Sequence, residues 1–194
     1  MIHHLNGRLI EKSPTHAVIE CAGVGYFVNI SLHTYSALGE DENVRLLTHL
    51  VVREDAHTLY GFHQEDERSV FLKLISVSGV GASTGRMIIS SMSPDEVKTA
   101  ILSGDVKAIQ NVKGIGAKTA QRIIVDLQDK IGEVSGGGEI ISLGGNTAKL
   151  EALSALSSLG FDNTKANKTL ESILKQHGTD LSVEALIKMA LKLM

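Results

Sequence analysis

The sequence predicts a multidomain α+β protein: a small β-barrel at the N-terminus, an all-α domain in the middle and a three-helix domain at the C-terminus. Three observations lead to this expectation. Apolar and polar residues alternate with a period of two up to residue 63, the pattern then becomes helical, and a glycine-rich stretch precedes the last helical segment. The boundaries that we expect are 1–63, 64–131, a linker at 132–147, and 148–194.

The first segment, residues 1–63, consists of the short alternating runs typical of a β-domain. A turn at Ser13-Pro14-Thr15 separates the first two runs, and one helical turn is expected near Leu32–Leu38. The expected strands are Gly7–Glu11, Ala17–Cys21, Gly25–Ile30, Val44–Val52 and Thr58–Phe62. Five short strands with one helical turn fit a small barrel of the OB type.

The middle segment, residues 64–131, has helical periodicity and a clear helix-start signal. Ser93 is a good N-cap residue, and Pro94 after it has the φ of a first helical residue. Glu96 stands three residues after Ser93 and completes a capping box. We therefore expect a helix to begin at Pro94.

The segment at 132–147 contains six glycines among sixteen residues, which is the composition of a flexible linker. After it, leucines recur at helical spacing on both sides of a turn at Gly160. Leu150 and Leu153 are expected in the core of a three-helix unit, which is small for a domain that folds alone.

An internal repeat with an offset of 35 residues lies in the middle segment. Residues 74–93 read LISVSGVGASTGRMIISSMS and residues 109–128 read IQNVKGIGAKTAQRIIVDLQ, with seven of twenty positions identical. Each copy has a helix, a Gly-x-Gly turn and a second helix. A single glycine turn between helices is common, but two copies with matching flanks indicate a tandem helix-hairpin-helix domain that binds DNA.

The Gly-x-Gly turn suits phosphate for a physical reason. Glycine allows positive φ and a close approach of the backbone to a ligand. The following helix then begins with unpaired N–H groups and the positive end of its dipole, where an anion is stabilised. Such contacts position DNA without reading its sequence. The expected DNA-binding residues are Gly79, Val80, Gly81, Ser83, Thr84 and Arg86 in the first copy and Gly114, Ile115, Gly116, Lys118, Thr119 and Arg122 in the second, with Val80 and Ile115 pointing inward to fix each turn.

The distribution of charge supports a nucleic-acid partner despite a net charge of −3. Residues 1–63 contain four Lys/Arg and seven Asp/Glu, whereas residues 72–124 contain seven Lys/Arg and three Asp/Glu. The acidic N-terminal segment therefore hides a basic middle, and it is the local charge that governs binding to phosphate.

Several other classes of protein are disfavoured. No apolar run reaches the roughly 18 residues that would span a bilayer, and the N-terminus lacks the pattern of a signal peptide. Cys21 has no partner for an internal disulfide, so we expect a cytoplasmic protein. The histidines have no ligand spacing, so neither a metal nor another cofactor is expected. Residues 116–119, Gly-Ala-Lys-Thr, resemble the end of a P-loop but lack its first glycine and preceding strand, which argues against ATPase activity.

These residues, in this order, resemble the RuvA family of Holliday-junction-binding proteins over nearly the whole chain. The most specific stretch is HLVVREDAHTLYGF at 49–62, and residues 23–26 and 159–161 are also similar. The resemblance implies a UBA-like C-terminal domain and a homotetramer, one or two of which hold open a four-way junction. It implies two protein partners: the hexameric ring ATPase RuvB, recruited and stimulated for branch migration in recombination and repair, and the junction nuclease RuvC. The chain itself would have no catalytic activity.

The resemblance also implies roles for two further groups of residues. Glu54 and Asp55 correspond to an acidic pin at the centre of the tetramer, whose charge would repel phosphates and disfavour a continuous duplex there. Four apolar residues of the C-terminal domain correspond to the surface that contacts the motor: Leu156, Leu159, Phe161 and Leu191.

The hairpins depart from the family pattern at several positions. Ala82 and Ser83 stand where the family often has proline and lysine, and Ala117 stands where a lysine is usual. We therefore expect the first hairpin to bind phosphate through backbone N–H groups, Thr84 and Arg86. Gly85 is also expected to weaken its helix by about 1 kcal/mol relative to alanine.

Two other functions remain alternatives. A helix-hairpin-helix glycosylase or lyase would need a catalytic Lys or Asp just beyond the hairpin, and Asp126 lies there within the expected helix. A single-strand-binding barrel would need exposed aromatic residues on which bases stack. The aromatic residues of the first segment are Tyr26, Phe27, Tyr35, Tyr60 and Phe62.

Overall fold

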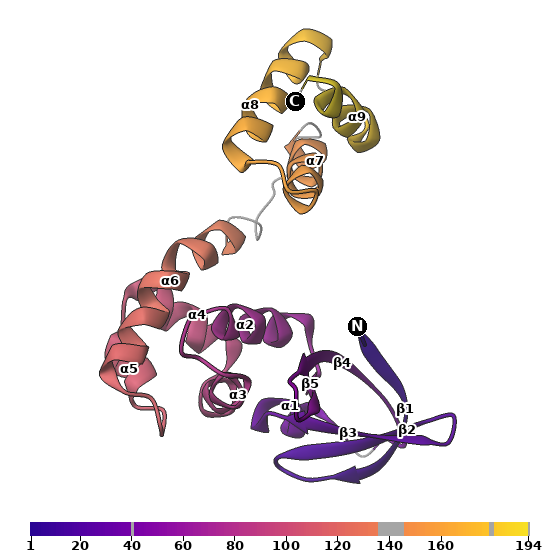
Figure 1. Cartoon of the computed structure of the whole chain (residues 1–194), viewed down its shortest axis with the longest axis vertical. Helices are drawn as coiled ribbons and strands as arrows, with labels where there is room; N and C mark the ends of the chain where they lie inside the picture. Colours follow the sequence, from indigo (N-terminus) through magenta and orange to yellow (C-terminus); the bar gives the residue numbers. More distant parts are fainter. Residues whose placement is uncertain (40, 136–145, 179–180, 194) are drawn as a thin grey trace. The chain divides into compact units, whose positions relative to one another are not determined.

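The computed structural model describes residues 1–39, 41–135, 146–178 and 181–193. The chain divides into two compact units, Met1–Gly136 and Gly137–Met194 (Figure 1). Residues 136–145 of the expected linker lie outside the described residues. The remaining ends of that segment are helical, because α6 continues to Ser135 and α7 begins at Asn146. A single glycine costs a helix only about 1 kcal/mol, so Gly132 does not end α6.

The N-terminal part of the first unit is a closed barrel with the strand order β1-β2-β3-β5-β4. Neighbouring strands are antiparallel except β3 and β5, which are parallel. The OB-type fold and the helical turn after the third strand are thus confirmed. The elements are β1 (His4–Lys12), β2 (His16–Cys21), β3 (Val24–Ile30), α1 (Leu32–Ala37), β4 (Asn43–Val52) and β5 (His57–Phe62).

Five helices follow the barrel: α2 (Glu65–Ile75), α3 (Ala82–Ser91), α4 (Pro94–Ser103), α5 (Val106–Gln110) and α6 (Ala117–Ser135). Helices α2 and α3 form the first helix-hairpin-helix, α5 and α6 form the second, and α4 connects them (Figure 1). The capping box at the start of α4 is confirmed, since the Ser93 hydroxyl accepts from the Glu96 N–H and the Glu96 carboxylate accepts from the Ser93 N–H.

Gly85 has a packing role that its low helix propensity hides. A Cβ built there would lie 3.0 Å from a methyl group of Ile75 and 3.3 Å from the ring of Phe71, both on α2. Glycine therefore lets α3 approach α2 closely. The equivalent residue of the second repeat, Ala120, is fully buried.

The barrel has a core of its own, but its last strand also belongs to a second core that it shares with the tandem hairpins. The ring centroids of Tyr60 and Phe62, at the end of β5, lie 5.3 and 4.9 Å from the ring centroid of Phe71 on α2. Helix α3 is tied to the barrel as well, because the Leu32 N–H donates to the Ser90 hydroxyl over 3.2 Å. The two predicted segments therefore form a single body.

A buried polar junction fixes the first turn of α2 against α1. The Glu67 side chain is fully buried and accepts hydrogen bonds from the hydroxyls of Ser31 and Thr34, the latter over 2.6 Å. The Thr34 hydroxyl also accepts from the His63 N–H over 3.0 Å. Because a buried carboxyl group without partners would be destabilising, these hydroxyls set the position of α2 relative to the barrel.

The second unit consists of α7 (Asn146–Ser158), α8 (Asn163–His177) and α9 (Val183–Leu193). Its core contains Leu153 at the edge and these fully or nearly fully buried residues: Ala152, Leu156, Ala166, Leu170, Ile173, Leu186 and Ala190. The prediction for Leu150 is wrong, because its side chain is 47% exposed. In the part of the chain that the structure describes, no helix is long and apolar enough to cross a membrane.

Replacing Thr34 with valine should destabilise the first unit, because valine keeps the shape but leaves Glu67 with the Ser31 hydroxyl alone and the His63 N–H without its partner. We expect the free energy of unfolding to fall by about 1–3 kcal/mol in urea titrations followed by circular dichroism. Thr34→Ser keeps the hydroxyl and is the matched control, with a loss of about 1 kcal/mol for the missing methyl group. A valine variant as stable as wild type would show that the junction contributes nothing.

Candidate nucleic-acid interface

The two hairpins have the same backbone geometry. The Val80 N–H donates to the Val77 carbonyl over 3.0 Å, and the equivalent bond from Ile115 to Val112 measures 3.1 Å. The first glycine of each turn is left-handed, with φ of 89° at Gly79 and 87° at Gly114. The internal repeat in the sequence is therefore a structural repeat.

The apolar residue between the two glycines anchors each turn. Val80 and Ile115 are only 5% and 6% exposed and belong to the shared core. Their N–H groups are used within the turn. Both side chains point inward, as predicted from the sequence, and they hold the turn in shape. They are therefore not available to a ligand.

The second glycine of each turn leaves open space where a helix begins. A Cβ built on Gly81 or Gly116 would meet no atom within 4 Å, and neither residue has a positive φ. Helix α3 starts after Gly81 without a side-chain cap, and Gly116 has no side chain with which to cap α6. The fold does not require glycine at these positions. A ligand that approaches the unpaired N–H groups does require it, because a side chain would stand in its way.

The polar side chains around the two helix starts differ in charge. Ser83 and Lys118 occupy equivalent, exposed positions, while Thr84 and Thr119 are partly buried. Lys113 is exposed as well, directly before Gly114, and the sequence prediction omitted it. Alignment of the two repeats could have identified it, because Lys113 directly precedes the first glycine and replaces Ser78 of the first copy. The second hairpin thus carries two lysines where the first carries two serines.

The Arg86 side chain, expected at the phosphate site of the first hairpin, is bonded to the barrel. Its Nη1 donates to the Thr15 carbonyl over 2.8 Å and to the Asn29 side-chain oxygen over 3.1 Å. The guanidinium is therefore held by the barrel. Arg86 thus fastens α3 to the barrel, and its role in binding phosphate stays a prediction.

Arg122 belongs to the second hairpin, but its side chain contacts the first. Its Nη1 donates to the carbonyl of Ser78, in the first hairpin, over 3.1 Å. The side chain is exposed. A residue of α6 therefore reaches the turn between α2 and α3.

The two predicted pin residues lie at the tip of the β4–β5 hairpin. The turn is closed by the Arg53 N–H, which donates to the Ala56 carbonyl over 2.9 Å. Glu54 and Asp55 are both exposed, and neither makes a hydrogen bond or ion pair with the residues that the structure describes. Their charges are thus directed to solvent or to a binding partner.

The C-terminal unit presents part of the predicted apolar surface. Leu159 is 62% exposed and Leu191 is 44% exposed, while Phe161 is partly buried against the core of the unit. The prediction that Leu156 belongs to this surface is wrong, because its side chain is fully buried. The turn at Gly160, where φ is 92°, brings the Phe161 N–H back to the Leu156 carbonyl and leaves that leucine beneath it.

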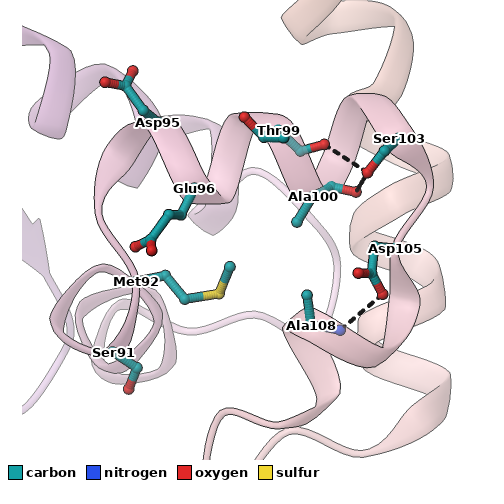
Figure 2. A pocket seen from close by; sticks show the side chains of 9 residues that line it. All are labelled: Ser91, Met92, Asp95, Glu96, Thr99, Ala100, Ser103, Asp105 and Ala108. Atoms are coloured by element: carbon teal, nitrogen blue, oxygen red, sulfur yellow. Dashed lines mark hydrogen bonds between the residues drawn. The ribbon is translucent and has the colours of Figure 1, made fainter.

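A pocket of about 430 Å³ lies between the end of α3, α4 and α5 (Figure 2). Its carboxylates serve the helix ends: Asp105 accepts from the Ala108 N–H, and Glu96 is held by Ser93. The backbone N–H and then the hydroxyl of Ser93 lower the pKa of Glu96 below its ordinary value. With Asp95 also on its wall, the pocket is acidic and unsuited to phosphate, and it lies at the end of α3 opposite to Gly81.

An OB-type barrel joined to two helix-hairpin-helix motifs with open helix starts defines a class of nucleic-acid-binding proteins. Comparison with protein families matches residues 1–61 to the RuvA N terminal domain, 71–129 to the SAM-like Helix-hairpin-helix tandem and 148–194 to the RuvA, C-terminal domain. Three similar curated proteins are each named Holliday junction branch migration complex subunit RuvA. The protein from Christiangramia forsetii is 58% identical and that from Flavobacterium psychrophilum 50%, each over 99% of both chains, and that from Cytophaga hutchinsonii is 46% identical over 100% of both. The chain belongs to the RuvA family.

Alanine substitutions at Gly114 and Gly116 should show which of the two glycines is needed to avoid backbone strain. Gly114→Ala forces a Cβ into a left-handed conformation, and we expect the free energy of unfolding to fall by about 1–2 kcal/mol. Gly116→Ala places the Cβ in open space at an ordinary φ, so its stability should stay within about 0.5 kcal/mol of wild type. Urea unfolding of both variants provides the comparison, and equal losses would contradict the assignment of strain to Gly114 alone.

Proposed function

We propose that this protein binds four-way DNA junctions independently of sequence, as the non-catalytic DNA-binding subunit of a branch migration complex. The observation that carries the proposal is the pair of matched hairpins, each with an unhindered helix start next to a glycine. The names of the curated relatives support the same substrate. All of the contacts proposed below are to the phosphate backbone, so sequence independence follows from the chemistry.

At each hairpin a phosphate approaches the second glycine, Gly81 or Gly116, and accepts hydrogen bonds from the first N–H groups of α3 or α6. The helix dipole adds to the attraction. The hydroxyls of Ser83, Thr84 and Thr119 lie on the first turn of these helices and add further donors. In the second hairpin the ammonium groups of Lys113 and Lys118 supply positive charge, which makes binding dependent on salt.

The protein acts as a homotetramer, one or two of which hold the junction open and square. Four copies of Glu54 and Asp55 then meet near the point where the strands exchange. A carboxylate about 6 Å from a phosphate raises the energy by roughly 1–3 kcal/mol, depending on the effective dielectric. This repulsion penalises a continuous duplex at the centre and favours separated strands.

The C-terminal unit recruits the motor. Leu159, Phe161 and Leu191 offer an apolar contact to the ring ATPase RuvB, which consumes the ATP and moves the DNA, while the nuclease RuvC shares the junction. Leu156 supports this surface from beneath. The chain itself requires no metal or cofactor, and it works in the cytoplasm.

Single-strand binding by the barrel is the weaker candidate. Tyr60 and Phe62 are 7% and 1% exposed, so they cannot act as stacking platforms. Phe27 is 56% exposed, but its ring is already stacked on His16 with 4.5 Å between centroids. The base-stacking surface that such a function needs is therefore small.

The proposal is tested by gel shifts of a four-way junction and a duplex of equal length across a salt series, with wild type and Gly116→Val. Wild type should prefer the junction. The valine should block phosphate from α6 and weaken junction binding at least tenfold, about 1.4 kcal/mol. Circular dichroism and thermal unfolding should remain those of wild type. The proposal fails if wild type has no preference for the junction, or if the folded variant binds as tightly as wild type.

The acidic pin is tested by the double variant Glu54→Gln, Asp55→Asn, which preserves size and removes charge. Junction affinity should stay equal or rise, duplex affinity should rise more, and high salt should shrink both differences because it screens the repulsion. Gel shifts with both DNAs at two salt concentrations measure these changes. If both affinities remain within a factor of two of wild type at low salt, the acids are only a solvated turn.

A further inference from the structure

The guanidinium of Arg122 is carried by the second repeat but lies on the hairpin of the first. Besides its hydrogen bond to the Ser78 carbonyl, Nη1 is 3.8 Å from the point where a Cβ of Gly79 would be. The contact spans 44 residues of sequence. No other hydrogen bond or ion pair occupies this side chain among the described residues, so its remaining N–H groups are available to a ligand.

The symmetry of the repeat explains why Arg122 reaches across. Its equivalent in the first copy, 35 residues earlier, is Met87. The sulfur of Met87 lies 4.0 Å from the point where a Cβ of Gly114 would be, in the second hairpin. Each repeat thus places the same position of its second helix against the other repeat's first glycine. The crossing is a property of the paired motifs rather than an accident of one long side chain.

The two hairpins differ in the positive charge that they carry. The second hairpin has Lys113 and Lys118 of its own, and the residue that reaches it, Met87, is neutral. The first hairpin has serines at both equivalent positions, and Arg86 is held by the barrel. Within the described residues, the one cationic side chain with a hydrogen bond to the turn at 78–81 is therefore that of Arg122.

We propose that Arg122 is the phosphate-binding cation of the first hairpin, so that the second repeat completes the site of the first. The inference rests on the proposed binding of DNA phosphates. An arginine suits the position because one N–H can hold the Ser78 carbonyl while others face the phosphate at Gly81. A lysine at the same place would be a point charge on a flexible stem without a fixed fork of donors.

The test is a mutant cycle in which Arg122→Gln is combined separately with Gly81→Val and with Gly116→Val. In the wild-type background the glutamine should weaken four-way junction binding about tenfold, as expected for loss of a charge-assisted contact. With Gly81→Val, which already blocks the first site, the further loss should be less than about twofold. With Gly116→Val, which blocks only the second site, the full loss of about tenfold should remain.

Three results would overturn the proposal. Losses of equal size in both backgrounds would mean that Arg122 supports the structure generally or binds elsewhere. Coupling to Gly116→Val instead would place Arg122 in the second site. No loss in the wild-type background would remove it from the interface. If wild type itself shows no preference for the junction over duplex, the proposed function fails, and that result is distinct from these three.

A charge-rescue experiment gives an independent readout. Ser83→Lys copies the lysine pattern of the second hairpin onto the first and should restore junction affinity to Arg122→Gln to within about threefold of wild type. Gln121→Lys adds the same charge to an exposed position of α6 and is the matched control, which should restore little. Equal rescue by both lysines would show that total charge matters and not a site at the first hairpin. Thermal unfolding of every variant confirms that the loss is not one of folding.

Discussion

The left-handed turn at Gly79 and at Gly114 is the constraint on which the DNA-facing surface depends. Only with φ near +90° does the chain reverse tightly enough for the next residue to enter the core and for the second glycine to stand at a helix start. The buried Val80 and Ile115 then secure each turn from within. The unpaired N–H groups are thus held in place before any ligand arrives, and binding need not order them.

A second consequence of the packing is that the acidic turn and the hairpins belong to one body. Glu67 and its hydroxyl partners, the aromatic contacts of Phe71 and the anchoring of Arg86 all join barrel and helices. A flexible connection would let Glu54 and Asp55 move relative to the phosphate sites. Because the two are fixed together, the proposed repulsion at the pin and attraction at the hairpins would act on one junction in one geometry. The distance between them is then set by the fold and not by the DNA.

The features that could be predicted from sequence are those encoded by neighbours along the chain. Alternation gave the five strands, the Ser93–Glu96 spacing gave a capping box, and the repeated Gly-x-Gly gave both hairpins. The errors have the opposite character. The bonds of Arg86 to Thr15 and Asn29 were missed because both partners lie in the barrel, more than fifty residues away along the chain. Leu150 and Leu156 share one leucine stripe, and only the packing of α8 and α9 decides that the second is buried and the first exposed.

The two repeats differ in charge at positions where the symmetry of their packing places the residues of one against the turn of the other. Position 87 and its equivalent 122 each contact the opposite turn, so a charge placed on either helix acts at the hairpin of its neighbour. Serines at 78 and 83 would leave the first hairpin weak if each motif worked alone. With Arg122 bonded to Ser78, the positive charge of the second repeat extends to the turn of the first hairpin. A helix-hairpin-helix of this kind is therefore better understood as a pair than as two copies, since the contact between Arg122 and Ser78 does not follow from the residues of either motif alone.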